Sequence, residues 1–235
     1  AAVTAYLSRF NKPVYPIGGN HDYAYSLSPG FKDLANPAER AAALERLKAA
    51  AGISDVRYSL KLGRYRLIFM SIDDLRYDDI SAISTGTLAW LEETLNADKE
   101  SPAVVFYHAP LEGILQTKNS VSGKPRFEAL PRDKIRALLR AHPQVFLWAS
   151  GHTHIAPGNA HFRHPVNLYD GRVYDIQVPD MDGRSFLSAK DKELKKHDGL
   201  WSVSLYFYPD KVTVKTYDHR KELWLEDLTR EFKPR

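Results

Sequence analysis

Short apolar runs alternate with amphipathic stretches along the chain, and this alternation predicts an α/β protein. Short runs rich in β-branched and aromatic residues predict strands at Val14–Ile17, Ala103–Tyr107, Val145–Trp148 and Val173–Val178. Between them, apolar residues at helical spacing predict helices over Pro37–Ala51, Thr87–Asn96 and Pro131–Ala141. Strands that alternate with helices are typical of a sheet with parallel neighbours.

Two other segments predict antiparallel hairpins. Tyr58–Lys61 and Arg66–Ile72 flank a turn that contains Gly63. Near the end of the chain, residues 201–208 alternate between apolar and polar side chains, and Val212–Thr216 returns after a Pro-Asp turn. Parallel and antiparallel pairs together predict mixed sheets.

The helix over residues 37–51 carries the clearest start and stop signals. Asn36 is a good N-cap, because its side chain can accept a hydrogen bond from the first helical turn. Gly52 can end the helix in a left-handed conformation. Leu44, Leu47 and Ala51 are spaced to form its buried side.

Candidate chemistry begins where the run Val145–Trp148 ends. Gly151 follows this run, and His152 and His154 come next, one residue apart. On extended backbone two such side chains would point to opposite faces, so they share a site only if the chain turns sharply, which Gly151 permits. The alternative is a pair of surface loop histidines. We favour a metal site, because imidazole is the commonest metal ligand.

The same combination recurs after two other predicted strands. Val14–Ile17 leads into a loop with Asn20, and Ala103–Tyr107 leads directly into His108. Ligands of α/β proteins gather at the carboxyl ends of strands. Imidazole nitrogens together with an amide oxygen suit a divalent ion such as Mn, Zn or Fe, so the sequence predicts a metal centre at one edge of the sheet.

These residues resemble a known family. Gly19-Asn20-His21-Asp22, the lone His108 and Gly151-His152-Thr153-His154 resemble three motifs of the calcineurin-like metallophosphoesterases, which run in the order D-x-H, G-D-x-x-D, G-N-H-D/E, H, G-H-x-H. The resemblance covers most of the chain. It implies one domain over residues 1–235 with a four-layer α-β-β-α sandwich of mixed sheets.

The resemblance also implies a reaction, the hydrolysis of a phosphomonoester or phosphodiester by water activated between two divalent metal ions. Asn20, His108 and His152 would hold one ion and His154 the other. His21 would protonate the leaving alkoxide. Asp22 would orient His21 by accepting its other N–H; the alternative is that Asp22 caps a turn.

The first two family motifs are absent before Gly18. In the family they supply further ligands, among them an aspartate that bridges the two ions. In addition, residues 1–10 have apolar groups at helical spacing but no N-cap. We therefore expect an N-terminally truncated domain that lacks its first strands and in which one metal site is incomplete. A scaffold or binding module is the alternative, and the intact GNHD, His and GHTH motifs favour an enzyme.

Composition narrows the class of partner. The chain has 235 residues, which suits one domain, and it contains no cysteine, so disulfides and thiolate ligands are excluded. No apolar run is long enough to span a membrane. A net charge of +4 favours anionic ligands but is too small to indicate nucleic-acid binding. We expect a small-molecule phosphoester as substrate; the sequence leaves its identity, the oligomeric state and the compartment open.

Metal content tests the expected truncation. A chain extended upstream through a D-x-H and a G-D-x-x-D motif should bind two metal ions, whereas residues 1–235 should bind at most one, because the bridging carboxylate would be absent. Elemental analysis of both purified chains measures this. Two ions on the shorter chain would contradict the expectation and would mean that its carboxylates come from elsewhere.

Overall fold

The computed structural model describes residues 9, 11–25, 34–74, 76, 80–114 and 127–234. The α-helices are α2 (Asn20–Tyr23), α3 (Pro37–Ala51), α4 (Thr85–Asn96) and α5 (Arg132–Ala141). Short 3-10 helices are η2 (Ala160–Arg163), η3 (Pro165–Asn167) and η4 (Glu226–Leu228). The predicted helix within residues 1–10 lies outside the described residues, apart from Arg9.

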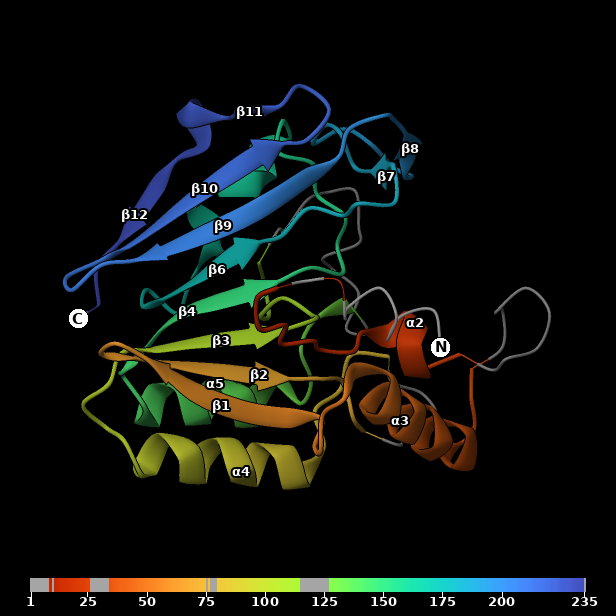
Figure 1. Ribbon diagram of the computed structural model, residues 1–235, viewed down its shortest axis with the longest axis vertical. Helices are drawn as coiled ribbons and strands as arrows, with labels where there is room; N and C mark the ends of the chain where they lie inside the picture. The colour runs from red at the N-terminus through yellow and green to blue at the C-terminus, as the bar shows by residue number, and fades with distance from the viewer. Residues whose placement is uncertain are drawn as a thin grey trace.

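A six-stranded mixed sheet forms the centre of the molecule, in the order β1-β2-β3-β4-β6-β5. Its strands are β1 (Arg57–Leu62), β2 (Tyr65–Met70), β3 (Ala103–Tyr107), β4 (Val145–Ser150), β5 (Leu168–Tyr169) and β6 (Val173–Gln177). The pairs β2–β3, β3–β4 and β4–β6 are parallel, and β1 and β5 run antiparallel at the edges. In Figure 1 the four parallel strands point towards the side on which α2 lies.

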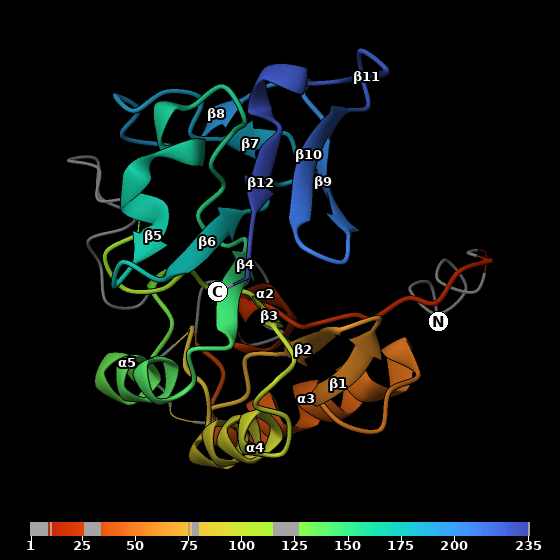
Figure 2. The same cartoon turned by 90° about the vertical axis from the view of Figure 1, so that its left-hand side faces the viewer.

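A second sheet has four strands, with β10 (Val212–Asp218) paired to β9 (Trp201–Phe207), β11 (Leu223–Trp224) and β12 (Arg230–Phe232), all antiparallel. A small two-stranded sheet pairs β7 (Arg184–Ser185) with β8 (Lys195–Lys196). Figure 2 shows the second sheet on one side of the central strands and the helices α4 and α5 side by side below them.

The alternation of side chains along β2 explains this layering. Ile68 and Met70 belong to a core cluster shared with the leucines of α4 and α5. Leu67 and Phe69 point the other way and belong to a second cluster, which includes Val214 of the four-stranded sheet. Successive residues of a strand face opposite sides, so an apolar strand of this kind must be covered on both. Helices cover one face and the second sheet covers the other.

Most predicted elements are confirmed, with boundaries shifted by one or two residues. The capping of α3 is also as predicted, since the Asn36 side chain accepts the Glu39 N–H at 3.0 Å. The predicted buried side of α3 is not confirmed. Leu44 and Leu47 are half-buried, whereas Arg40 is buried. The Arg40 guanidinium donates hydrogen bonds to backbone and tyrosine oxygens beneath the helix, so a polar contact replaces part of the expected apolar one.

The predicted strand Val14–Ile17 is wrong. This segment is extended but pairs with no strand among the described residues. Side chains hold it instead: the Tyr58 hydroxyl donates to the Pro16 carbonyl, and the Tyr15 ring stacks on Phe69 with centroids 5.5 Å apart. An apolar run signals that a segment is covered, whereas a strand also needs a neighbour for its backbone N–H and C=O groups.

No helix in the described part of the chain is long and apolar enough to cross a membrane.

Trp148 couples the core to the loop that follows β3. The indole is fully buried at the centre of β4 and its Nε1–H donates to the Ala109 carbonyl at 3.0 Å. Trp148→Phe should lower the free energy of unfolding by about 1–3 kcal/mol, because it leaves that carbonyl without its buried donor. Urea unfolding followed by circular dichroism measures the loss. Trp90→Phe, on a half-buried side chain of α4, is the control, and an equal loss there would contradict the prediction.

Candidate metal centre

The predicted histidines lie where two neighbouring parallel strands end. His108 directly follows β3, and His152 and His154 follow β4. Backbone hydrogen bonds continue the sheet past the strand ends, because Gly151 N–H donates to the His108 carbonyl at 3.0 Å and Val178 N–H donates to the Ser150 carbonyl at 2.7 Å. The parallel register therefore brings both loops to the same edge of the sheet.

Asn20 reaches the same edge from the first turn of α2. The loop before it is fixed to the end of β2, since Gly18 N–H donates to the Ser71 hydroxyl at 2.9 Å and Ile72 N–H donates to the Gly18 carbonyl at 3.1 Å. Asn20 is buried, and its Oδ1 lies 2.8 Å from Nε2 of His108. Side chains that are far apart in the sequence thus meet at a single point.

Gly19 is required for this approach. A Cβ atom at this position would lie only 2.6 Å from Cε1 of the His108 ring, so any larger residue would displace the imidazole. Asp22 supports the same turn, because its carboxylate accepts the Gly19 N–H at 2.8 Å. In the described part of the chain this carboxylate bonds to the loop backbone rather than to His21. The capping role considered for Asp22 is therefore the one observed.

The turn after β4 is not made as predicted. His152 and His154 themselves adopt left-handed backbone, with φ of 63° and 49°, whereas Gly151 does not. Such conformations are unfavourable for residues with a Cβ and often occur at functional sites. They direct both imidazoles inward, and the His108 and His152 ring centroids lie 4.7 Å apart.

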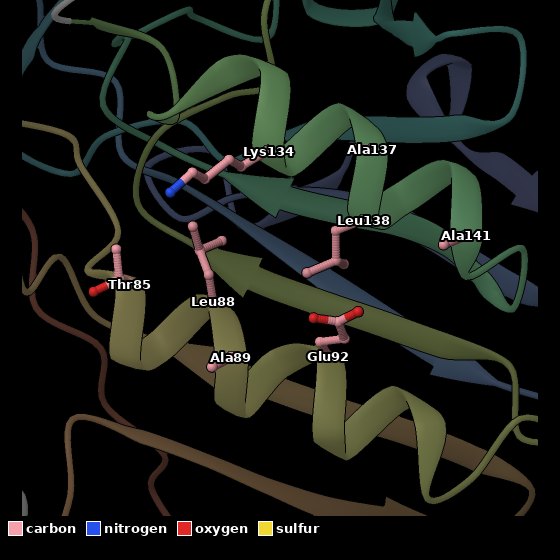
Figure 3. Close-up of a pocket in the computed structure, with 8 residues that line it drawn as sticks. All are labelled: Thr85, Leu88, Ala89, Glu92, Lys134, Ala137, Leu138 and Ala141. Atoms are coloured by element: carbon pink, nitrogen blue, oxygen red, sulfur yellow. The ribbon is translucent and has the colours of Figure 1, made fainter.

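One cavity collects all of these side chains. It has a volume of about 230 Å³, and five of the predicted residues line it: Asn20, His21, His108, His152 and His154. Its other walls are Tyr25, Phe127, Thr153, Phe186 and Leu194. A larger hollow of about 490 Å³ lies between α4 and α5 (Figure 3), but its lining is mostly alanine and leucine with one lysine and one glutamate. Convergent ligand chemistry makes the smaller cavity the candidate site.

Burial controls the charge of His108. Desolvation lowers the pKa of this imidazole, the neighbouring His154 and His21 act in the same direction to a smaller extent, and together they bring it to about 4. His108 is therefore neutral at physiological pH, which is the form in which imidazole binds metal ions.

The comparisons with known proteins agree with this geometry. A profile described as calcineurin-like phosphoesterase matches residues 1–156, well over half of the chain. The chain belongs to the calcineurin-like phosphoesterase family. No match is found among curated protein sequences. Family membership implies divalent metal ions and, in general terms, a metal-dependent phosphoesterase.

Solved structures of two phosphatases share the fold of this chain. A dimetal phosphatase from Danio rerio aligns with a TM-score of 0.55 at 13% identity, over 98% of this chain and 75% of its own. A purple acid phosphatase, PPD1, from yellow lupin (Lupinus luteus) seeds aligns with a TM-score of 0.53 at 13% identity, over 92% of this chain and 40% of its own. The predicted family and the α/β fold with mixed sheets are thus confirmed.

The chain also has acidic residues at the site that sequence reasoning missed. Asp180 and Asp182 lie in the loop after β6, the next parallel strand beyond β4. Their carboxylate oxygens lie 3.3 Å and 4.0 Å from Nδ1 of His154. A usable signal was present, since polar residues directly after the predicted strand Val173–Val178 mark another strand end at the same edge.

A buried polar network supports the floor of the site. Asp175 of β6 accepts hydrogen bonds from the Leu111 N–H at 2.8 Å, the Ser150 hydroxyl at 2.6 Å and the Gln177 amide at 2.8 Å. Gln177 in turn accepts the Thr153 hydroxyl at 3.0 Å, between the two histidines of the loop. This network connects the loops after β3 and β4 through the side chains of one strand. Sequence reasoning missed it, because these residues look like ordinary strand positions.

Asp175 should make the stability of the folded chain depend on pH. Burial raises the pKa of this carboxyl to about 7 in the folded protein, well above its value in the unfolded chain. The folded state then binds the extra proton, so its contribution to stability is fully present below about pH 4 and is lost as pH rises through 7. Urea unfolding at pH 5 and pH 8 should show a larger decrease for the wild type than for Asp175→Asn. Parallel decreases would contradict the assignment.

Proposed function

We propose that this chain hydrolyses a small-molecule phosphoester at the cavity between α2 and the ends of β3 and β4. The 2.8 Å approach of Asn20 Oδ1 to His108 Nε2, with the His152 ring beside them, carries the proposal. An amide oxygen and two imidazoles converge there from three separate segments, and the most deeply buried imidazole is neutral. Because an amide oxygen only accepts, Nε2 of His108 donates its proton to Asn20 in the absence of metal, and a cation that bound between them would replace that proton.

In the proposal the donor set serves two metal ions, and for the second of them these residues supply a single ligand. Asn20, His108 and His152 hold one ion and His154 holds the other, and nitrogen with amide oxygen suits Mn, Zn or Fe. When bound, such ions neutralise phosphoryl oxygens and lower the pKa of a coordinated water. The protein fixes the positions of these ligands in three ways: through Gly19, through the hydrogen-bond network of Asp175 and through the left-handed backbone of His152 and His154.

His21 is the proposed general acid. It lines the cavity from the first turn of α2, beside Asn20, and its ring stacks on Tyr25 with centroids 5.0 Å apart. The side chain is exposed, so it can exchange protons with solvent between turnovers. An imidazole can give a proton to the leaving alkoxide and recover one from water, which is what a general acid must do.

The dimensions of the cavity support a small substrate. A volume of about 230 Å³ accommodates a phosphoryl group with a modest organic group, and Phe127, Phe186 and Leu194 contribute apolar walls. The net charge of +4 favours the approach of an anion. A phosphomonoester and a phosphodiester both satisfy these conditions.

His21→Ala should lower kcat for phosphoester hydrolysis by at least about tenfold while leaving the bound metal unchanged, because the residue moves a proton and holds no ion. The loss should be larger for an alkyl phosphoester than for a nitrophenyl ester, whose leaving group hardly needs protonation. Steady-state kinetics on both substrates, with elemental analysis of each preparation, measures the effect.

His219→Ala is the matched control, since this exposed histidine lies on the second sheet and donates to or accepts from Ser202. It should behave as wild type. Unchanged turnover of the alkyl ester by His21→Ala, with full metal content, would remove the general-acid role. Loss of metal in that variant would instead place His21 among the ligands.

A further inference from the structure

The two ring nitrogens of His154 have different surroundings. Nδ1 lies 3.1 Å from the Arg184 carbonyl oxygen and 3.3 Å from a carboxylate oxygen of Asp180. A carbonyl oxygen carries no proton, so Nδ1 must be the donor in that hydrogen bond. The same imidazole lines the cavity. In the neutral ring, the lone pair is then left on Nε2, the nitrogen that Asp180 and Arg184 do not occupy.

The loop that supplies these acceptors is fixed to His154 through its backbone as well. Phe186 N–H donates to the His154 carbonyl at 2.8 Å, and Ile155 forms a parallel bridge with Phe186. The Asp180 carboxylate is itself held from two sides, by the Asp182 N–H at 3.1 Å and by the Ser185 hydroxyl. The Asp180 carboxylate is therefore held in a fixed orientation as a hydrogen-bond acceptor for His154.

From this geometry we infer that Asp180 is a positioning residue for His154: it accepts the Nδ1 proton, fixes the tautomer and turns Nε2 into the cavity as a metal ligand. Metal-binding histidines commonly donate their second nitrogen to a carboxylate, which fixes the ring and makes it a stronger ligand. That a metal binds at Nε2 rests on the proposed function, whereas the tautomer does not.

A different arrangement would place one ion directly among His154, Asp180 and Asp182, whose potential ligand atoms all lie within 4.8 Å of one another. The contacts disfavour it. Both Asp182 oxygens are engaged by Arg184, with the backbone N–H at 2.8 Å and the guanidinium at 3.1 Å. Asp182 is also the more exposed of the two, at 42% against 11% for Asp180. An ion at Nδ1 would have to displace the bond to the Arg184 carbonyl as well.

The first experiment measures the tautomer in metal-free protein. Long-range ¹H–¹⁵N correlation spectra of the ¹⁵N-labelled chain, recorded at a pH where His154 is neutral, should show a protonated Nδ1 and an unprotonated Nε2. His154→Gln identifies the signals by their loss. A protonated Nε2 would overturn the inference, whatever the chain does as an enzyme.

The second experiment measures Zn²⁺ affinity at His154, by titration of the ¹⁵N-labelled chain followed at the His154 Nε2 signal. Asp180→Asn should weaken binding by about 10–100-fold, the usual effect of removing a carboxylate behind a ligating histidine. Asp182→Asn is the matched control from the same loop and should bind as wild type. Spectra of the Zn²⁺-loaded protein should show that Nε2, and not Nδ1, is metallated.

The outcomes separate this inference from the proposed function. Wild-type affinity in Asp180→Asn, an equal loss in both variants, or metallation at Nδ1 would each overturn the positioning role. If tautomer and Zn²⁺ affinity behave as expected but no phosphoester is hydrolysed, the positioning role stands and the proposed function fails.

Discussion

The parallel pairing of β2, β3, β4 and β6 is the constraint on which the site depends. Parallel strands must all end at one edge of the sheet, so each connection that leaves that edge has the opportunity to contribute a side chain. The loops after β3, β4 and β6 each place side chains at this edge. The loop that contains Gly18 is held there by hydrogen bonds to the residues that follow β2. Asn20, His108 and His152 meet because the register of the strands continues into the loops. Shifting any of these strands by one residue would invert its two faces and carry the ligands away from one another.

Beneath this edge of the sheet, the core contains a buried polar network around Asp175 instead of apolar side chains alone. Asp175 is buried under the loops, and its three donors come from β4, β6 and the segment after β3. A half-satisfied group at such a depth would be destabilising, and a fully bonded one ties the three segments together. Support of this kind explains how His152 and His154 keep left-handed backbone, since a strained conformation persists only where its surroundings fix it.

Two histidines at the same cavity acquire opposite properties from their surroundings. Burial removes water from His108 and lowers its pKa, so the ring is neutral. His154 is only half-buried, and its hydrogen bond to Asp180 raises its pKa. The Asp180 carboxyl responds in turn: burial would raise its pKa, but hydrogen bonds from His154 and Ser185 hold it well below its usual value. The chain thus places a neutral imidazole and a more basic one at the same cavity without using different residue types.

Sequence alone determined most of the secondary structure, the α/β class and the proposed ligand set, because helix caps, apolar periodicity and short motifs are local properties. Asn36 before Pro37 and the histidines after two apolar runs needed no knowledge of neighbours. Other features were decided by tertiary structure. Val14–Ile17 has the composition of a strand but has no partner strand among the described residues. Asp180 comes close to His154 only because β6 lies beside β4. In the sequence Asp175 resembles an ordinary strand residue; only the structure shows that it is buried and accepts three hydrogen bonds. Pairing, burial and orientation depend on contacts between distant segments, and a one-dimensional pattern does not specify those contacts.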